Sequence, residues 1–251
     1  MVARPFAALL VMALAACGDA SKTEATGAAP KAAASAAGPG AAATPATRDW
    51  TRVVEATPEG GFRMGNPDAP VKIIEFASLT CPACRNFHQT GVKPLKDQYV
   101  ASGRVSYEFR NFVLNGADLA ATLLARCQGA SGFFPLADAF FTNQEAWLLP
   151  FTKLTAEEQR RLQALPPERQ VTGFADAGQL DAFVRVRGIP RARYEACLSD
   201  QQAIGQLERI QREAVERYRV QGTPTFVLNG ETLNGVLDWP TLEQRIKDRL
   251  G

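Results

Sequence analysis

Two cysteines three positions apart, Cys81 and Cys84, are the residues of this chain best suited to do chemistry. They follow an apolar run at 71–77 that is typical of a buried strand, and Pro82 suits the first position of a helix. At a helix N-terminus, free N–H groups and the helix dipole favour a thiolate at Cys81. Because Cys84 lies one turn further on, the pair can form a small-ring disulfide and exchange it with other dithiols. This hypothesis requires Cys81 to be reachable from solvent and within bonding reach of Cys84.

Half of a zinc site is the alternative for the same two cysteines. A Cys₄ zinc site normally has a second closely spaced pair. The cysteines that follow, Cys127 and Cys197, stand far apart in the sequence. The spacing therefore favours redox exchange, and we expect no metal and no diffusible cofactor.

An acidic residue, Glu75, interrupts the apolar run before the cysteines. Burying a carboxylate without compensation costs free energy, so strand packing gives no reason for it. We interpret Glu75 as part of the chemistry. The alternative is a strand-end glutamate whose carboxylate reaches out to water.

Length and composition limit the class of protein. The chain has 251 residues, enough for one large domain or two small ones, and 46% of them are hydrophobic, which is enough for a sizeable core. Lys plus Arg number 28 against 26 Asp plus Glu, a net charge of +2. This balance argues against a nucleic-acid surface, and we expect no nucleic-acid partner.

Residues 1–17 have the layout of a secretory signal, with Arg4 ahead of an apolar stretch and small residues before Cys17. The stretch is too short to span a membrane, which needs about 20 apolar residues. Its last four residues, Leu-Ala-Ala-Cys, resemble a bacterial lipobox, which implies a lipid anchor on Cys17. Asp19 resembles a signal that retains lipoproteins on the inner membrane. An ordinary cleaved signal, in which Cys17 has no role, is the alternative.

The next segment, 18–48, consists mainly of Ala, Gly, Ser, Thr and Pro. It has too few large apolar side chains to offset the entropy of ordering, so we expect a flexible tether. The folded domain would then occupy 49–251.

Hydrophobic periodicity divides this domain into strands followed by a block of helices. The pattern predicts strands over 51–56, 71–77 and 104–112, and we read Pro58–Gly65 as a Gly-rich turn. Asn229 and Gly230 predict a hairpin turn between two later strands. The pattern predicts helices over 117–127, 136–147, 155–165, 178–188, 191–198, 201–220 and 239–250. The predicted class is α/β, with an all-helical insertion over about 117–200.

The pair and its surroundings resemble the active site of the thioredoxin superfamily. The domain length and the inserted helices resemble the DsbA-type periplasmic thiol-disulfide oxidoreductases. Three features besides Cys-Pro-Ala-Cys carry the resemblance, namely Glu75, the stretch Gly222-Thr223-Pro224-Thr225 and the insertion itself. The fold expected is therefore a thioredoxin fold with an inserted all-helical block.

The resemblance also implies roles for particular residues. Cys81 exchanges bonds with the substrate, Cys84 resolves the mixed disulfide, and Glu75 moves a proton to or from Cys84. Thr223, with a cis Pro224, presents backbone groups to the substrate, beside Pro82 and Ala83. The insertion caps the site and helps to form a substrate groove. Ala83 departs from the histidine of the best-known oxidases, which implies a less acidic Cys81.

Three other residues have competing interpretations. In an oxidising compartment, Cys127 and Cys197 are expected to form a structural disulfide; two free thiols or an electron relay are the alternatives. His88 lies on the helical face of the cysteine pair, either to tune the sulfurs or simply to pack.

These observations together predict an envelope dithiol-disulfide oxidoreductase, an oxidase in the first instance. A reductase or isomerase of the same fold is the alternative, and a non-catalytic, membrane-anchored binding module is the alternative of another class. Expected partners are cysteine-containing protein substrates, a quinone-linked membrane redox partner, and the lipid bilayer through Cys17. We expect a monomer on the periplasmic side of a bacterial membrane, the inner rather than the outer one.

Overall fold

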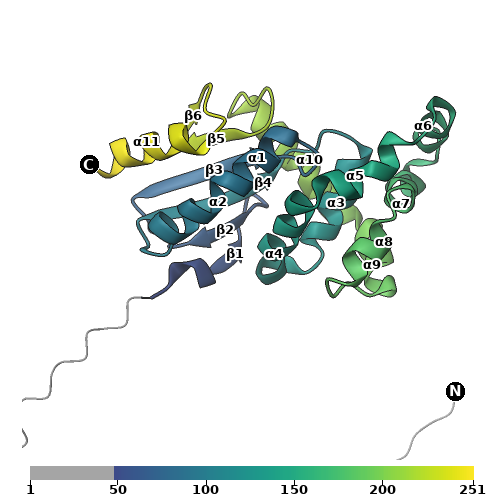
Figure 1. Ribbon diagram of the computed structural model, residues 1–251, viewed down its shortest axis with the longest axis horizontal. Helices are drawn as coiled ribbons and strands as arrows, with labels where there is room; N and C mark the ends of the chain where they lie inside the picture. Colours follow the sequence, from purple (N-terminus) through teal and green to yellow (C-terminus); the bar gives the residue numbers. More distant parts are fainter. Residues whose placement is uncertain (1–47) are drawn as a thin grey trace, which may run out of the picture. The chain divides into compact units, whose positions relative to one another are not determined.

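The computed structural model describes residues 48–251, which form an α/β fold on a six-stranded sheet. The strand order is β1-β2-β4-β3-β5-β6 (Figure 1). In this sheet β3 and β4 pair in parallel, and the other neighbouring strands pair antiparallel. The strands are β1 (Val54–Ala56), β2 (Phe62–Gly65), β3 (Val71–Ala77), β4 (Val105–Asn111), β5 (Thr225–Leu228) and β6 (Glu231–Leu233). The expected α/β class is confirmed.

Strand β3 lies between β4 and β5, and helices cover both of its faces. Glu75 is in register with Phe226, whose ring packs on Phe87 of the first helix with centroids 4.6 Å apart. The next residue, Phe76, points the other way and contacts Tyr218, which follows α10 (Gln201–Glu216). Because strand side chains alternate between faces, Glu75 faces the helix that carries the cysteines.

The N-terminal part of the sheet differs from the sequence-based expectation. Residues 62–65, which we read as part of a turn, form strand β2 and pair with β4 from Phe62 opposite Phe109 to Gly65 opposite Ser106. The preceding segment begins with a 3₁₀ turn, η1 (Trp50–Arg52), so β1 is shorter than predicted. Pairing with β4 satisfies the backbone of a four-residue segment that is too short to show a periodic pattern.

Helix α1 (Pro82–Thr90) follows β3 directly. Beyond it, Gly91 precedes the short α2 (Val92–Pro94), and Pro94 precedes the π-helical η2 (Leu95–Val100). The closing helix α11 (Trp239–Leu250) has Pro240 in its first turn. Trp239 of α11 lies against Gly91, so α11 and the end of α1 are neighbours.

The helical insertion lies between β4 and α10 and gathers to one side of the sheet (Figure 1). The helix predicted over 136–147 is divided at Asn143, and one helix of the insertion, α7, was missed. Apolar spacing does not register a break of one residue. The buried residues of α7, Val171 and Ala175, have helical spacing and were overlooked. The helices are α3 (Gly116–Arg126), α4 (Gly129–Thr142), α5 (Gln144–Thr152), α6 (Ala156–Gln163), α7 (Pro167–Ala177), α8 (Leu180–Arg185) and α9 (Arg191–Leu198).

A disulfide joins Cys127, at the end of α3, to Cys197 in α9. The two Cα atoms are 5.7 Å apart, which is typical of disulfides. Five aromatic side chains of α4 and α5 are buried: Phe133, Phe134, Phe140, Phe141 and Trp147. The insertion is therefore held both by packing and by a covalent link.

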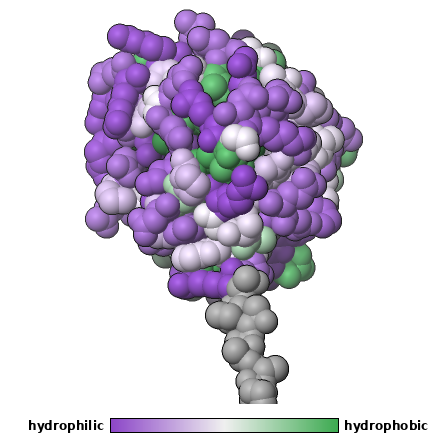
Figure 2. Space-filling model, turned by 90° about the vertical axis from the view of Figure 1, so that its left-hand side faces the viewer, coloured by the Kyte–Doolittle hydropathy of each residue, from purple (hydrophilic) through white to green (hydrophobic). Residues whose placement is uncertain are grey.

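Figure 2 shows the molecule turned by 90° from the view of Figure 1. The face seen there is mostly hydrophilic, with small scattered apolar areas. Within residues 48–251, no helix is both long and apolar enough to cross a bilayer. The predicted lipidation residue Cys17, and all of the predicted tether except Arg48, lie outside the described residues.

Candidate active site

Cys81 and Cys84 lie where strand β3 meets helix α1. Cys81 is the N-cap of α1, and Pro82 occupies its first turn, as predicted. The backbone N–H of Cys84 donates a hydrogen bond to the Cys81 Sγ, with N and S 3.4 Å apart. Both cysteines carry free thiols in this structure. The local sequence accounts for the place of Cys81 at the helix start, because a strand, a cap and a proline follow one another directly.

The electrostatic surroundings of Cys81 favour its thiolate. The Cys84 thiol donates toward the Cys81 sulfur, and this bond, helped by the Thr223 side chain and the backbone N–H groups of Ala83 and Cys84, lowers the pKa of Cys81 to about 5. Partial burial opposes the shift. The Cys81 thiol also donates a hydrogen bond to the Thr223 carbonyl, with S and O 3.2 Å apart. The low pKa arises without the histidine that Ala83 replaces.

Cys84 has the opposite character. Its side chain is fully buried, and burial is the main cause that raises its pKa well above the ordinary value for a thiol. The Cys81 sulfur and the charge of Glu75 raise the pKa of Cys84 further. The two sulfurs are thus one reactive thiolate and one thiol that needs a base to ionise.

Glu75 lies beneath this pair with only 1% of its surface exposed. The interpretation as a strand-end glutamate that reaches water is wrong. Tyr107 of β4 donates a hydrogen bond to its Oε2. Burial raises the pKa of Glu75 to about 8; the Tyr107 bond opposes this shift, and the charge of Cys81 adds to it. A carboxyl with this pKa can both give and take a proton near neutral pH.

The loop before β5 completes the site on the other side of Cys81. The Thr223–Pro224 peptide bond is cis, as the resemblance implies, and the Thr223 carbonyl is the group that contacts the Cys81 sulfur. Strand β5 pairs with β3 and β6, so Pro224 precedes an inner strand and not an edge strand. The cis turn places the loop beside the sulfur pair.

Cys81 is more enclosed than the redox hypothesis suggested, since only 7% of its surface is exposed. It nevertheless lines an open groove of about 550 Å³, which gives access from solvent. None of the groove residues is charged, and its far wall combines apolar side chains with the uncharged polar ones of Thr152, Gln159 and Gln163. The groove runs from Thr80, Cys81 and Pro82 past Leu114, Asn115, Gly116 and Ala117 to Leu148, Phe151, Thr152, Leu154, Gln159, Gln163 and Phe174.

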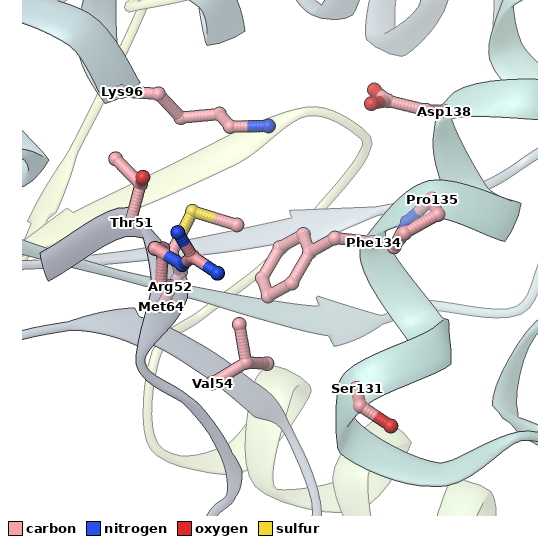
Figure 3. Close-up of a pocket in the computed structure, with 9 residues that line it drawn as sticks. All are labelled: Thr51, Arg52, Val54, Met64, Lys96, Ser131, Phe134, Pro135 and Asp138. Atoms are coloured by element: carbon pink, nitrogen blue, oxygen red, sulfur yellow. The ribbon is translucent and has the colours of Figure 1, made fainter. Parts of the chain in front are cut away.

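Other predicted residues lie away from the sulfur pair. His88 shares a hydrogen bond with Asp138 of α4 and stacks on Phe141, with ring centroids 4.6 Å apart. These contacts fasten α1 to the insertion and favour the packing interpretation. Asp138 also lines a pocket of about 500 Å³ with Arg52 and Lys96, and neither cysteine of the pair reaches it (Figure 3).

Sequence reasoning missed three buried polar residues around the site. Tyr107 holds Glu75, while Asp118 and Gln144 hydrogen-bond the backbone just before Cys81. Asp118 had a faint signal, because it follows the helix cap Asn115 by three residues. Tyr107 and Gln144 have none in the local sequence. In residues 48–251, no three His, Cys, Asp or Glu side chains gather as a metal site would require.

Fold and site together define a class, the proteins with a DsbA-like thioredoxin fold. A family model described as thioredoxin matches residues 57–248, and the chain belongs to this family. A crystal structure of a protein-disulfide isomerase from Novosphingobium aromaticivorans is 31% identical with a TM-score of 0.74, and the match covers 79% of this chain and 100% of that one. Alpha-DsbA1 from Wolbachia pipientis shares the fold, with 21% identity, a TM-score of 0.59, and coverage of 74% and 88%.

A curated relative from Rickettsia bellii carries the provisional name protein-disulfide oxidoreductase. It is 28% identical over 173 residues, which is 68% of this chain and 58% of that protein. The chain therefore spans less than two thirds of the length of this relative.

Proposed function

We propose that this protein is a dithiol-disulfide oxidoreductase that exchanges disulfides with cysteine-containing polypeptides through Cys81 and Cys84. The observation that carries the proposal is the contrast between the two sulfurs. Cys81, with a pKa lowered to about 5, borders an open groove, and Cys84, with a raised pKa, is buried behind it. Disulfide exchange requires one sulfur that reacts with the client and a second sulfur that forms or breaks the internal disulfide.

The direction we propose first is oxidation of the client. A client thiolate attacks the Sγ of Cys81 in the Cys81–Cys84 disulfide; a client–Cys81 bond forms, and Cys84 leaves and takes a proton from Glu75. A second client thiolate then attacks the client sulfur, which closes the client disulfide and releases Cys81 as a thiolate. Two electrons pass from client to protein. A low pKa makes Cys81 a good leaving group and stabilises the reduced pair, so the disulfide is oxidising.

The client polypeptide lies across the site between two hollows. On one side is the uncharged groove described above, whose wall includes Leu148 and Phe151. On the other side a smaller pocket of about 240 Å³ is lined by residues that include Thr223 and Pro224. The backbone next to Pro224 and the turn at Pro82 and Ala83 orient the chain that carries the client cysteine.

Placement in the cell is part of the proposal. Lipidated Cys17 anchors the protein to the inner membrane, and residues 18–48 tether the catalytic domain, 49–251, on the periplasmic side. A quinone-linked membrane partner reoxidises the Cys81–Cys84 pair, and the protein acts as a monomer. The layout of the N-terminal sequence supports the anchor.

Reduction or isomerisation is the second candidate, because the similar Novosphingobium protein carries the name of an isomerase. The thiol state of Cys81 and Cys84 in growing cells, trapped by alkylation, separates the two. An oxidase holds the pair mostly as a disulfide, whereas a reductase or isomerase holds it mostly as a dithiol. The purified protein must also oxidise a reduced test peptide or reduce an insulin-like disulfide. If it does neither, it is a binding module.

Replacing Glu75 by glutamine is expected to slow disulfide exchange at the Cys81–Cys84 pair by roughly 10²-fold, the lower end of what a positioned acid-base group contributes, because Cys84 loses its proton donor. Glutamine can still accept the Tyr107 hydrogen bond, so the packing is kept. Stopped-flow exchange rates across pH measure the effect. The Tyr107→Phe variant is the control, since it keeps the carboxyl and alters only its hydrogen bond. Unchanged rates in Glu75→Gln at every pH would remove Glu75 from the mechanism.

The same variant changes how stability depends on pH. In the folded protein the pKa of Glu75 is about 8, above its ordinary value of 4.5, so folding takes up a proton between these values. The free energy of unfolding contributed by this group is therefore highest below pH 4.5 and falls as pH rises towards 8. Glutamine does not titrate, and urea unfolding should show a flatter profile for Glu75→Gln.

A further inference from the structure

The loop that leads into Cys81 is held by two buried side chains of the helical insertion. Asp118 of α3 accepts a hydrogen bond from the Leu79 N–H at 3.0 Å through one oxygen and from the Leu114 N–H at 2.9 Å through the other. Burial raises the pKa of Asp118 only to about 6, so it is ionised at neutral pH and accepts both bonds strongly.

Gln144, the first residue of α5, holds the other side of the same loop. Its Nε2 donates to the Leu79 carbonyl at 2.8 Å and to the Cys81 carbonyl at 3.0 Å. Only 2% of Gln144 is exposed, and Leu79 is fully buried. Without Gln144 the buried Leu79 carbonyl would lose this bond, which costs free energy, while the Cys81 carbonyl would keep its backbone bond from the Arg85 N–H at 3.1 Å. Gln144 is also the one side chain of the described residues that hydrogen-bonds the backbone carbonyl of Cys81.

We propose that Gln144 is a positioning residue, which holds the Cys81 backbone in the orientation that aims the N–H groups of α1 at the Cys81 sulfur. The N–H of Cys84 lies 3.4 Å from that sulfur, near the long end of a useful contact. Cys81 caps α1 with extended backbone angles, and both the first backbone bond of α1 and the amide of Gln144 hold its carbonyl. Fixing its carbonyl therefore fixes the cap geometry on which the thiolate depends.

The same residue links the reactive sulfur to the groove. Helix α5 begins with Gln144 and carries Leu148 and Phe151 of the groove wall. If a client moves α5, Gln144 moves with the helix and transmits the displacement to the backbone of Cys81. This step rests on the proposed function, because it assumes that clients occupy the groove.

The test compares Gln144→Met with Gln170→Met in the full chain. Methionine has a similar shape but no donor. Gln170 is a matched control because its Nε2 also donates to two backbone carbonyls, of Gln163 and Leu165, both at 2.9 Å and away from the site. We measure the pKa of Cys81 from the pH dependence of its alkylation and its thiolate absorbance, together with the thermal midpoint.

Gln144→Met is expected to raise the pKa of Cys81 by about half a unit to one unit. Alkylation near pH 4 then slows roughly 3- to 10-fold, since each unit reduces the thiolate fraction tenfold below the pKa. Gln170→Met should lower the thermal midpoint without moving this pKa. If both variants lose stability and the pKa of Cys81 moves in neither, Gln144 is structural only and the proposal is wrong.

Should Gln144→Met not fold, Gln144→Asn keeps a neutral amide but shortens it by one methylene, so that it cannot reach both carbonyls. Its Cys81 pKa is expected to rise in the same way, and an unchanged value would again contradict the proposal. The alkylation readout needs no client protein. A wild-type protein that lacks exchange activity would therefore refute the proposed function while leaving the comparison of pKa values valid.

Discussion

Replacement of Cys81 by serine is expected to reduce disulfide exchange by roughly 10³-fold or more, because a hydroxyl neither ionises near neutral pH nor forms a disulfide. The wild-type sulfur, with a pKa lowered to about 5, is almost entirely ionised at pH 7. Initial rates of oxidation of a reduced test peptide, and of reduction of an insulin-like disulfide, measure the loss. Folding should be preserved, since serine is smaller than cysteine and can still cap α1.

Replacement of Cys84 by serine tests the other half of the pair. Cys81 then still attacks client disulfides, but no resolving thiol remains, so mixed disulfides between Cys81 and clients accumulate. They are detected as reductant-sensitive species of higher mass on gels. Substantial exchange by Cys81→Ser, or mixed disulfides through another cysteine, would show that the reactive sulfur has been wrongly assigned.

The second large effect concerns stability. Removing the Cys127–Cys197 disulfide by the double change Cys127→Ser and Cys197→Ser is expected to lower the free energy of unfolding by about 4 kcal/mol in the chain-entropy model. The two cysteines are separated by 70 positions, and the expected stabilisation by a disulfide grows with the length of the loop that it closes. This corresponds to roughly a 10³-fold change in the folding equilibrium. Urea unfolding of the oxidised proteins measures it.

The control for this experiment is the double change Cys81→Ser and Cys84→Ser, which removes two cysteines but leaves the Cys127–Cys197 bond intact. Exchange activity of the Cys127→Ser and Cys197→Ser protein should stay close to wild type below its unfolding midpoint. An unchanged unfolding midpoint would mean that the bond adds nothing to stability. A strong loss of exchange in the still folded protein would indicate an electron relay instead of a structural bond.

The core of the candidate site could be predicted from local sequence because its parts are contiguous. A buried strand, an N-cap and a proline follow one another at 71–82, and this order alone places Cys81 at a helix start. The hairpin at Asn229–Gly230 is equally local, and both residues have positive φ angles as such a turn requires. Short-range steric and hydrogen-bonding preferences determine these features.

For Glu75, the local sequence predicted the burial of the side chain but not its hydrogen-bond partner. Its burial was expected from the apolar residues around it, and its closeness to the sulfurs was implied by the resemblance. Its partner Tyr107 lies 32 positions away, on a strand that pairs with β3 in parallel. Nothing in the sequence around Tyr107 distinguishes it from an ordinary strand aromatic.

The sequence by itself determined the place of Cys81 and Cys84 at a helix start and most of the order of strands and helices, and the resemblance implied the buried acid beneath the pair. The tertiary structure alone decided the pairing of β2, the groove beside Cys81 and the contacts of Gln144 with the loop before it. The physical reason is the distance along the chain over which each interaction acts. Capping, helix dipoles and apolar periodicity act within a few residues, whereas strand register and buried hydrogen bonds arise between distant segments once the core has closed.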